Sequence, residues 1–299
     1  MTNNRTDHLK RGSDVTPLEA LTAGSIAGAV SRAVTAPLDT IKIRLQLESS
    51  GFKERKTVPT IIKNLLRHEG VIAFWKGNVP AEILYILYGG SQFASYSILN
   101  KQLLILEQLY KIKLSESTHS LIAGIGSGIT STLVTYPFDL LRTRLVANRT
   151  RNLLSMSSIV KSIIQTEGIR GIFAGIRPAM LSVSTTSGLM FWSYELARDF
   201  SSNFKHVPFI EGICGFIAGA FSKGVTFPLD TLRKRCQMCS VVHGHPFSAL
   251  HLFISILRRE GVLGLYRGFG VSIIKTAPTS AISLFMYEYS LSFIRKIEL

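Results

Sequence analysis

The sequence predicts an all-α membrane protein whose six transmembrane helices form three tandem two-helix repeats. Three observations predict this class: a motif that recurs three times, six apolar segments of membrane-spanning length, and basic residues concentrated in every second connection. The 299 residues are 46% hydrophobic, with a mean hydropathy of +0.26 and a net charge of +15. Such a charge indicates a phosphate-bearing partner, a nucleic acid or an anionic membrane surface.

A motif that contains a proline, an acid and two bases marks the repeats. It reads PLDTIKIR from residue 37, PFDLLRTR from residue 137 and PLDTLRKR from residue 228. A second motif follows each copy at a nearly constant distance: EGVIAFWKG from residue 69, EGIRGIFAG from residue 167 and EGVLGLYRG from residue 260. Two motifs at matching distances in three places indicate an internal repeat.

Each repeat contains two apolar segments of about 20 residues, the length at which a helix spans a membrane. A basic connection with a short amphipathic pattern joins the two segments. The six segments are 19–36, 79–100, 117–136, 177–196, 209–227 and 270–291. A soluble all-α repeat protein is the alternative, but solenoid units are shorter and have charged solvent faces.

The charges are distributed as a one-sided membrane topology requires. The three connections 42–76, 142–175 and 233–267 contain 20 of the 34 lysines and arginines but only 5 of the 19 acids. Basic loops gather on one side of a membrane. With six spans, both termini are then expected on the opposite side. Because the bases flank membrane-length segments, we expect no nucleic-acid partner.

Other classes of function have little support in the sequence. Residues 1–16 are polar, lack the apolar core of a secretory signal and contain acids that a transit peptide avoids, so we expect a disordered tail. The pair Cys236 and Cys239 forms a lone CxxC, which has too few ligands for structural zinc. No phosphate loop or catalytic set of side chains is evident. We therefore expect no enzyme activity, no cofactor and no metal.

The two motifs, repeated three times over nearly the whole chain, resemble those of the mitochondrial carrier family. One departure is Ala174, where the second copy should have a base. The resemblance implies pseudo-threefold symmetry, short matrix-side helices and a central site that opens alternately to either side. It also implies the mitochondrial inner membrane, with both termini in the intermembrane space. We expect a monomer with an anionic lipid partner such as cardiolipin.

The resemblance implies a matrix gate formed by the first motif. Its acids would pair with bases of neighbouring repeats, as Asp39–Arg142, Asp139–Arg233 and Asp230–Lys42. Two glutamines, Gln46 and Gln237, would bond both partners of a pair, whereas the second copy has Val146 at that position. The alternative is that these charges only anchor the helices at the membrane interface.

The cytoplasmic gate should be weaker. The family has an aromatic residue, an acid and, three residues after the acid, a base late in each even-numbered helix. Here only Glu195, Arg198 and Glu288 remain of the charges. At most one pair, Glu288 with Arg198, can form, so we expect a low barrier on this side. Such a carrier should work without a strictly coupled counter-substrate.

Threefold alignment, together with the resemblance, locates a substrate site. Its candidate residues are Arg32, Leu84, Tyr88, Ser182, Val183, Thr186, Lys223, Lys275 and Thr276. Three of them are bases with no obvious acid of their own, which suits a diphosphate, while Leu84 and Tyr88 suit a ring. Thiamine pyrophosphate has this chemistry, and so does a nucleotide. Snorkelling of Lys275 to the membrane interface is the alternative for that residue.

The chain is therefore expected to be one integral membrane domain that imports a small phosphorylated solute into the matrix by alternating access. Its repeats would span 17–110, 111–205 and 206–299. Rival substrates are coenzyme A and deoxynucleotides. A non-transporting scaffold on the same fold is the alternative from another class.

Overall fold

The computed structural model describes residues 16–48, 57–111, 114–202, 210–243 and 248–297. Within these ranges the chain is helical and contains no strand, which confirms the all-α prediction. Six of the described helices have between 27 and 34 residues: α2 (Pro17–Leu47), α4 (Asn78–Tyr110), α5 (Glu116–Ala147), α7 (Ile176–Ser202), α8 (Ile210–His243) and α11 (Phe269–Ile297). A helix of 27 residues is about 40 Å long, enough to cross a membrane.

Short helical elements join the long helices in the same order in each repeat. The first connection contains α3 (Val58–Asn64), a π-helical turn η2 (Leu65–Glu69) and a 3₁₀ turn η3 (Val71–Trp75). The second contains α6 (Met156–Glu167) and η4 (Ile169–Phe173), and the third contains α9 (Ala249–Glu260) and α10 (Val262–Leu265). A glycine with positive φ follows η2, α6 and α9: Gly70, Gly168 and Gly261.

Local signals in the sequence define several helix starts. Thr16 and Glu19 form a reciprocal capping box at the start of α2, because each side chain accepts a hydrogen bond from the backbone nitrogen of the other residue. The Ser115 hydroxyl accepts from the backbone nitrogen of Thr118 at 3.2 Å, and Ser155 does the same for Ser158. The amphipathic connections thus become separate helices.

The motif prolines lie inside continuous helices. Pro37, Pro137 and Pro228 are interior residues of α2, α5 and α8, which continue for ten or more residues beyond them. Proline alone disfavours a helix interior. The segments after the prolines are nevertheless helical because they pack on the short helices and on neighbouring repeats.

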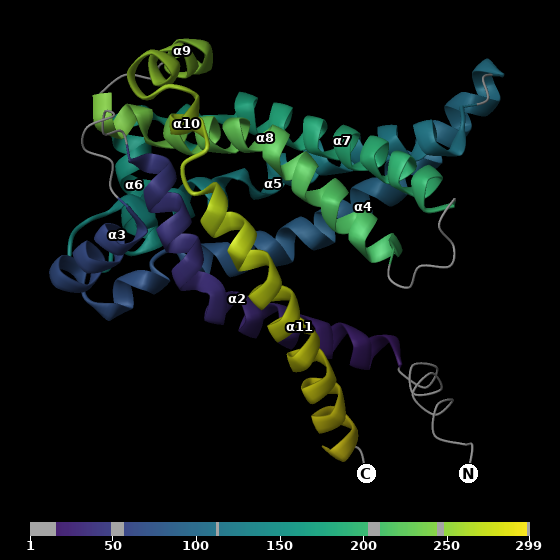
Figure 1. Ribbon diagram of the computed structural model, residues 1–299, viewed down its shortest axis with the longest axis horizontal. Helices are drawn as coiled ribbons and strands as arrows, with labels where there is room; N and C mark the ends of the chain where they lie inside the picture. Colours follow the sequence, from purple (N-terminus) through teal and green to yellow (C-terminus); the bar gives the residue numbers. More distant parts are fainter. Residues whose placement is uncertain (1–15, 49–56, 112–113, 203–209, 244–247, 298–299) are drawn as a thin grey trace. The chain divides into compact units, whose positions relative to one another are not determined.

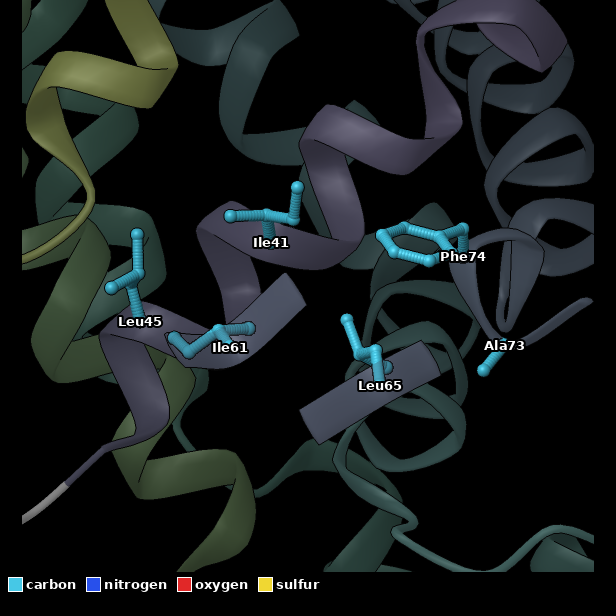
Figure 2. Packing of buried hydrophobic residues seen from close by; sticks show 6 residues of the cluster. All are labelled: Ile41, Leu45, Ile61, Leu65, Ala73 and Phe74. Carbon is cyan, nitrogen blue, oxygen red and sulfur yellow. The ribbon is translucent and has the colours of Figure 1, made fainter. Parts of the chain in front are cut away.

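A small apolar core lies under each copy of the first motif. Figure 2 shows the first one, in which Ile41 and Leu45 of α2 pack with Ile61 and Leu65 of the connection, and with Phe74. The other two cores use equivalent positions: Leu141 and Leu145 with Ile159 and Ile163, and Leu232 and Cys236 with Ile256 and the partly buried Leu252. Burial of this kind contributes about 1.5–3 kcal/mol per large side chain.

The structure divides into two compact units. One comprises Met1–Asp39 with Ser272–Leu299, and the other comprises Thr40–Val271. In the larger unit, α4 lies against α5, and α7 lies against α8 and α5 (Figure 1). In the smaller unit, Glu19 pairs with Arg295 at 3.8 Å. The larger unit contains complete copies of both motifs, except for residues 37–39 of the first.

The hydropathy of the long helices is uneven. Judged by length and composition alone, two described stretches could cross a membrane: Thr118–Ala147 and Val262–Lys296. Within the described residues the other long helices do not meet the same criteria of length, hydropathy and low charge. Large apolar side chains are nevertheless exposed along α4, where Ile86, Phe93 and Leu109 are 73%, 83% and 71% exposed. Such an exposed apolar surface suits contact with lipid.

Candidate functional site

The second motif joins each repeat to the next through its last glycine. Gly77, Gly175 and Gly268 all have positive φ. A Cβ at Gly77 would lie 2.9 Å from the backbone oxygen of Arg142, and at Gly175 it would lie 3.1 Å from that of Arg233. At Gly268 it would lie 3.1 Å from the backbone oxygen of Lys42. Each repeat thus touches the backbone of a base in the next first motif, in cyclic order.

A buried or partly buried ion pair accompanies each glycine contact. The second base of each first motif pairs with the glutamate of its own repeat: Arg44 with Glu69 at 2.8 Å, Arg144 with Glu167 at 2.6 Å and Arg235 with Glu260 at 2.5 Å. The same guanidinium groups donate to a backbone oxygen of the following repeat. These acceptors are Asn148 at 2.9 Å, Gln237 at 3.3 Å and Gln46 at 2.8 Å.

Sequence reasoning gave no role to these second bases or to the last glycines. The signal that could have found the ion pairs is the near-constant spacing of arginine and glutamate, which recurs in all three copies. At Glu69, burial disfavours the charge, but hydrogen bonds from Arg44 and Lys76 outweigh it. The pKa of Glu69 therefore lies below its usual value.

Asp139 is the most closely bound of the predicted gate acids among the described residues. It accepts from Arg233 at 3.0 Å, as the sequence led us to expect, and also from Lys234 at 2.7 Å. The Gln237 amide nitrogen lies 2.5 Å from its second carboxylate oxygen. The Arg233 guanidinium also lies over the Tyr136 ring, 5.3 Å from its centroid.

The other two gate acids bind lysines of the predicted substrate site. Asp230 accepts from Lys223 at 2.9 Å and from the Ser182 hydroxyl at 3.0 Å. In the smaller unit, Asp39 accepts from Lys275 at 2.6 Å. The expectation that these lysines have no acid of their own is therefore wrong. Lys223 precedes Asp230 by two helical turns, which places both on one helix face, whereas the Lys275 contact joins two helices far apart in the sequence.

The remaining predicted bases also lie near aromatic rings in the larger unit, and Lys42 acts electrostatically on Asp230, its predicted partner. The Lys42 ammonium lies 5.5 Å from the centroid of the Phe227 ring. The Arg142 guanidinium lies 5.9 Å from the centroid of the Tyr85 ring and donates to the Tyr85 hydroxyl at 3.4 Å. The predicted pair Asp39–Arg142 has one residue in each unit and stays a prediction.

The two predicted glutamines, Gln46 and Gln237, differ in their hydrogen-bond partners. Gln237 bonds Asp139 and lies 3.5 Å from the Lys234 ammonium, so it connects an acid with a base. The Gln46 amide nitrogen instead donates to the Thr231 hydroxyl at 3.4 Å. Its amide oxygen, which would have to accept from Lys42, is buried and has no hydrogen-bond partner among the described residues. The expectation that Gln46 bonds both partners of a pair is wrong, because the Asp230 carboxylate is bound to Lys223 and Ser182.

Several of the other substrate candidates meet where α4, α5 and α7 come together. A Cβ at Gly128 of α5 would lie 2.8 Å from Val183 and 4.0 Å from the Tyr88 hydroxyl. Leu84 is buried one turn before Tyr88. The Thr186 hydroxyl bonds the Ser182 backbone oxygen at 2.7 Å. Arg32, Lys275 and Thr276 belong to the smaller unit.

The predicted cytoplasmic gate is only partly described. Glu195 and Arg198 lie in α7, but their side chains are outside the described part of the chain. Glu288 lies in α11. In the first repeat the position of the base is occupied by Asn100, whose side-chain oxygen is 2.7 Å from His119. His119 also pairs with Glu107 at 2.6 Å, so it connects α4 to the start of α5.

Comparison with known proteins identifies the family. The family model for mitochondrial carrier protein matches residues 13–105, 114–205 and 204–298. The chain belongs to the mitochondrial carrier family. The resemblance of the motifs is thereby confirmed, and the three matched spans each contain one copy of both motifs.

Individual carriers are similar over their whole length. The chain is 74% identical to "Mitochondrial thiamine pyrophosphate carrier 1" of Candida albicans, over 99% of both chains. It is 64% identical to the protein of the same name from Lodderomyces elongisporus, over 99% of this chain and 97% of the relative. The Saccharomyces cerevisiae protein of that name is 37% identical, over 97% of this chain and 98% of the relative.

Proposed function

We propose that this carrier imports thiamine pyrophosphate into the mitochondrial matrix across the inner membrane. The observation that supports the substrate most is the 74% identity, over 99% of both chains, to a relative named as a thiamine pyrophosphate carrier. Three family repeats support alternating access as the mechanism. The three repeats, 17–110, 111–205 and 206–299, would form one integral membrane domain, with both termini in the intermembrane space.

The two lysines Lys223 and Lys275 are the proposed binding groups for phosphate. Each already binds a carboxylate within its own unit, at 2.9 Å and 2.6 Å. An ammonium that holds a carboxylate can hold a phosphate oxygen in the same way, because both are charge-assisted hydrogen bonds. Arg32 is the third proposed cation. Leu84, Tyr88, Ser182, Val183, Thr186 and Thr276 are proposed to complete the contacts with the substrate.

Binding at these lysines would also change the gate. Lys42 already acts electrostatically on Asp230. A phosphate that takes Lys223 would therefore leave Lys42 as the lysine that acts on Asp230, which is the pair expected from the family motif. Substrate binding would thus be coupled to the ion pairs of the gate. A ligand shifts a conformational equilibrium only through such differences in contact between states.

The proposed matrix gate comprises Asp39, Lys42, Asp139, Arg142, Asp230, Arg233, Gln46 and Gln237, with Gln46 acting through Thr231. The proposed cytoplasmic gate comprises Glu195, Arg198 and Glu288. An anionic lipid such as cardiolipin is the proposed lipid partner, and the monomer the proposed transport unit. The net charge of +15 is compatible with anionic lipid.

Uptake into liposomes tests this proposal. The purified carrier is reconstituted, and uptake of labelled thiamine pyrophosphate is compared with that of coenzyme A, deoxynucleotides and phosphate. We expect saturable uptake of thiamine pyrophosphate, and weaker uptake of the others. Faster uptake of coenzyme A or a nucleotide would show that the protein is a carrier with a different substrate. No uptake of any of them above protein-free liposomes would favour a non-transporting scaffold.

A further inference from the structure

Each interface between consecutive repeats is called a seam below. At two of the three seams, the last base of the second motif bridges the two repeats. Lys76 binds Glu69 and donates to the backbone oxygens of Asn148 at 3.0 Å and Thr150 at 2.7 Å, in the second repeat. Arg267 lies 3.5 Å from Glu260 and donates to the backbone oxygen of Glu48 at 2.6 Å, in the first repeat. Each base therefore ties its own glutamate to the end of the next repeat's first helix.

The seam between the second and third repeats lacks this tie. Ala174 stands in place of the base, and its methyl group can neither bind Glu167 nor reach across the seam. Glu167 is accordingly less enclosed, with 13% of its side chain exposed against 4% for Glu69 and 3% for Glu260. Tyr136 donates to the Ala174 backbone oxygen at 2.6 Å, but both residues belong to the second repeat.

A different cation, Lys234, is present at this seam, at a position where neither of the other two copies of the first motif has a base. Lys234 lies between the two bases of the third motif, where the first copy has Ile43 and the second has Thr143. Its ammonium lies 2.7 Å from Asp139 and 2.9 Å from the Thr143 hydroxyl, both in the second repeat. Only 13% of its side chain is exposed. A lysine so enclosed is costly unless it is paired.

We propose that Lys234 closes the seam between the second and third repeats in place of the base missing at Ala174. The lysine at this seam binds the aspartate of the first motif, whereas the bases at the other two seams bind the glutamate of the second motif. Asp139 is then held by two bases, so this seam opens only when both Arg233 and Lys234 have left it. The inference rests on the proposed gate but needs no particular substrate.

The native thiol of Cys236 can be used to measure how often this seam opens. Cys236 is 7% exposed, and its Cβ lies 3.0 Å from the position of a Cβ at Gly175. With Cys214 and Cys239 replaced by alanine, the labelling rate of Cys236 by a maleimide in the purified carrier measures how often the seam opens. The reading does not depend on transport, so its failure is distinguishable from failure of the proposed function.

Three variants test the role of Lys234. Lys234→Thr, which introduces the residue of the second copy, should label several-fold faster and unfold about 4 °C lower. Adding Ala174→Lys to it should restore most of both losses. Lys63→Thr, which removes an exposed lysine of α3, should change neither.

Equal labelling rates in Lys234→Thr and its parent would overturn the proposal. So would a Lys234→Thr effect of the same size in an Asp139→Asn background, because the lysine would then act through some other partner. If Ala174→Lys fails to slow the labelling of Lys234→Thr, the claim that one tie replaces the other is wrong.

Discussion

The Lys223 ammonium lies 2.9 Å from the carboxylate of Asp230. A residue that is proposed to bind the substrate therefore pairs with a residue of the proposed gate. Both belong to α8, on either side of Pro228. Lys275 and Asp39 repeat the relationship at 2.6 Å in the smaller unit. An anionic substrate must compete with these aspartates for the lysines, which connects binding with gating.

Replacing Lys223 by alanine should weaken transport. A hydrogen bond to a charged group contributes about 1.5–3 kcal/mol, so the KM for thiamine pyrophosphate should rise roughly 10- to 100-fold. Liposome uptake measures it, with Lys161→Ala, an exposed lysine of α6, as the control. If Lys223→Ala keeps the wild-type KM, the residue does not bind the substrate.

The three glutamates of the second motif should differ in their contribution to stability. Glu69 binds both Arg44 and Lys76, whereas the described partner of Glu167 is Arg144. Removing one partner of a buried pair costs roughly 3–5 kcal/mol. Glu69→Gln should therefore lower the unfolding temperature in detergent more than Glu167→Gln does. Equal decreases in unfolding temperature would show that Lys76 adds nothing to stability.

The contribution of Glu69 should also depend on pH. Its pKa in the folded protein lies below its usual value of 4.5. The stabilisation is then fully present above pH 4.5 and is lost as the pH falls through the lower, folded-state pKa. Thermal unfolding of wild type and Glu69→Gln should differ at neutral pH and converge in acid. A constant difference down to pH 3 would contradict the assignment.

The last glycine of each second motif should not tolerate a side chain. Gly175 has a φ of 81°, and a Cβ there would lie 3.0 Å from atoms of both Cys236 and Tyr136. Gly175→Ala therefore combines backbone strain with a clash and should cost about 2 kcal/mol or more. Gly90→Ala in α4 is the control, because nothing in the structure lies within 4 Å of its Cβ position. A similar unfolding temperature for both variants would exclude close packing at Gly175.

Transport should proceed without substrate on the far side. Few charges remain for the cytoplasmic gate, and in the first repeat Asn100 binds His119 where a base is expected. A gate with few ion pairs opens at little cost, since each partly hydrated pair contributes about 0–1 kcal/mol. Liposomes loaded with buffer alone should accumulate labelled thiamine pyrophosphate. Strict dependence on internal substrate would contradict a weak gate.

The sequence predicted the helical class, the family and the repeated motifs, because these depend on residue type at fixed spacing. It also predicted the contact between Asp139 and Arg233, which lie 3.0 Å apart. The second bases were missed although their spacing from the glutamates of the second motif recurs in all three copies. Their other partners are backbone oxygens of another repeat, which no residue type indicates.

The errors concern side chains with more than one partner in reach. Asp230 has Lys223 on its own helix face, and the family motif does not include that lysine. Gln46 was expected to follow Gln237, but Asp139 offers Gln237 an acceptor at 2.5 Å, while Gln46 bonds Thr231. Lys234 was passed over because it lies between two motif bases, at a position with no common residue among the three copies.

The initial rate of thiamine pyrophosphate uptake by Lys275→Ala tests the account most directly. Lys275 holds Asp39 and is proposed to bind the substrate's phosphate, so the variant should take up labelled thiamine pyrophosphate no faster than protein-free liposomes. Its unfolding temperature without substrate should show that it is folded, and thiamine pyrophosphate should no longer raise that temperature as it does for the wild type. Uptake at the wild-type rate by Lys275→Ala would contradict the account.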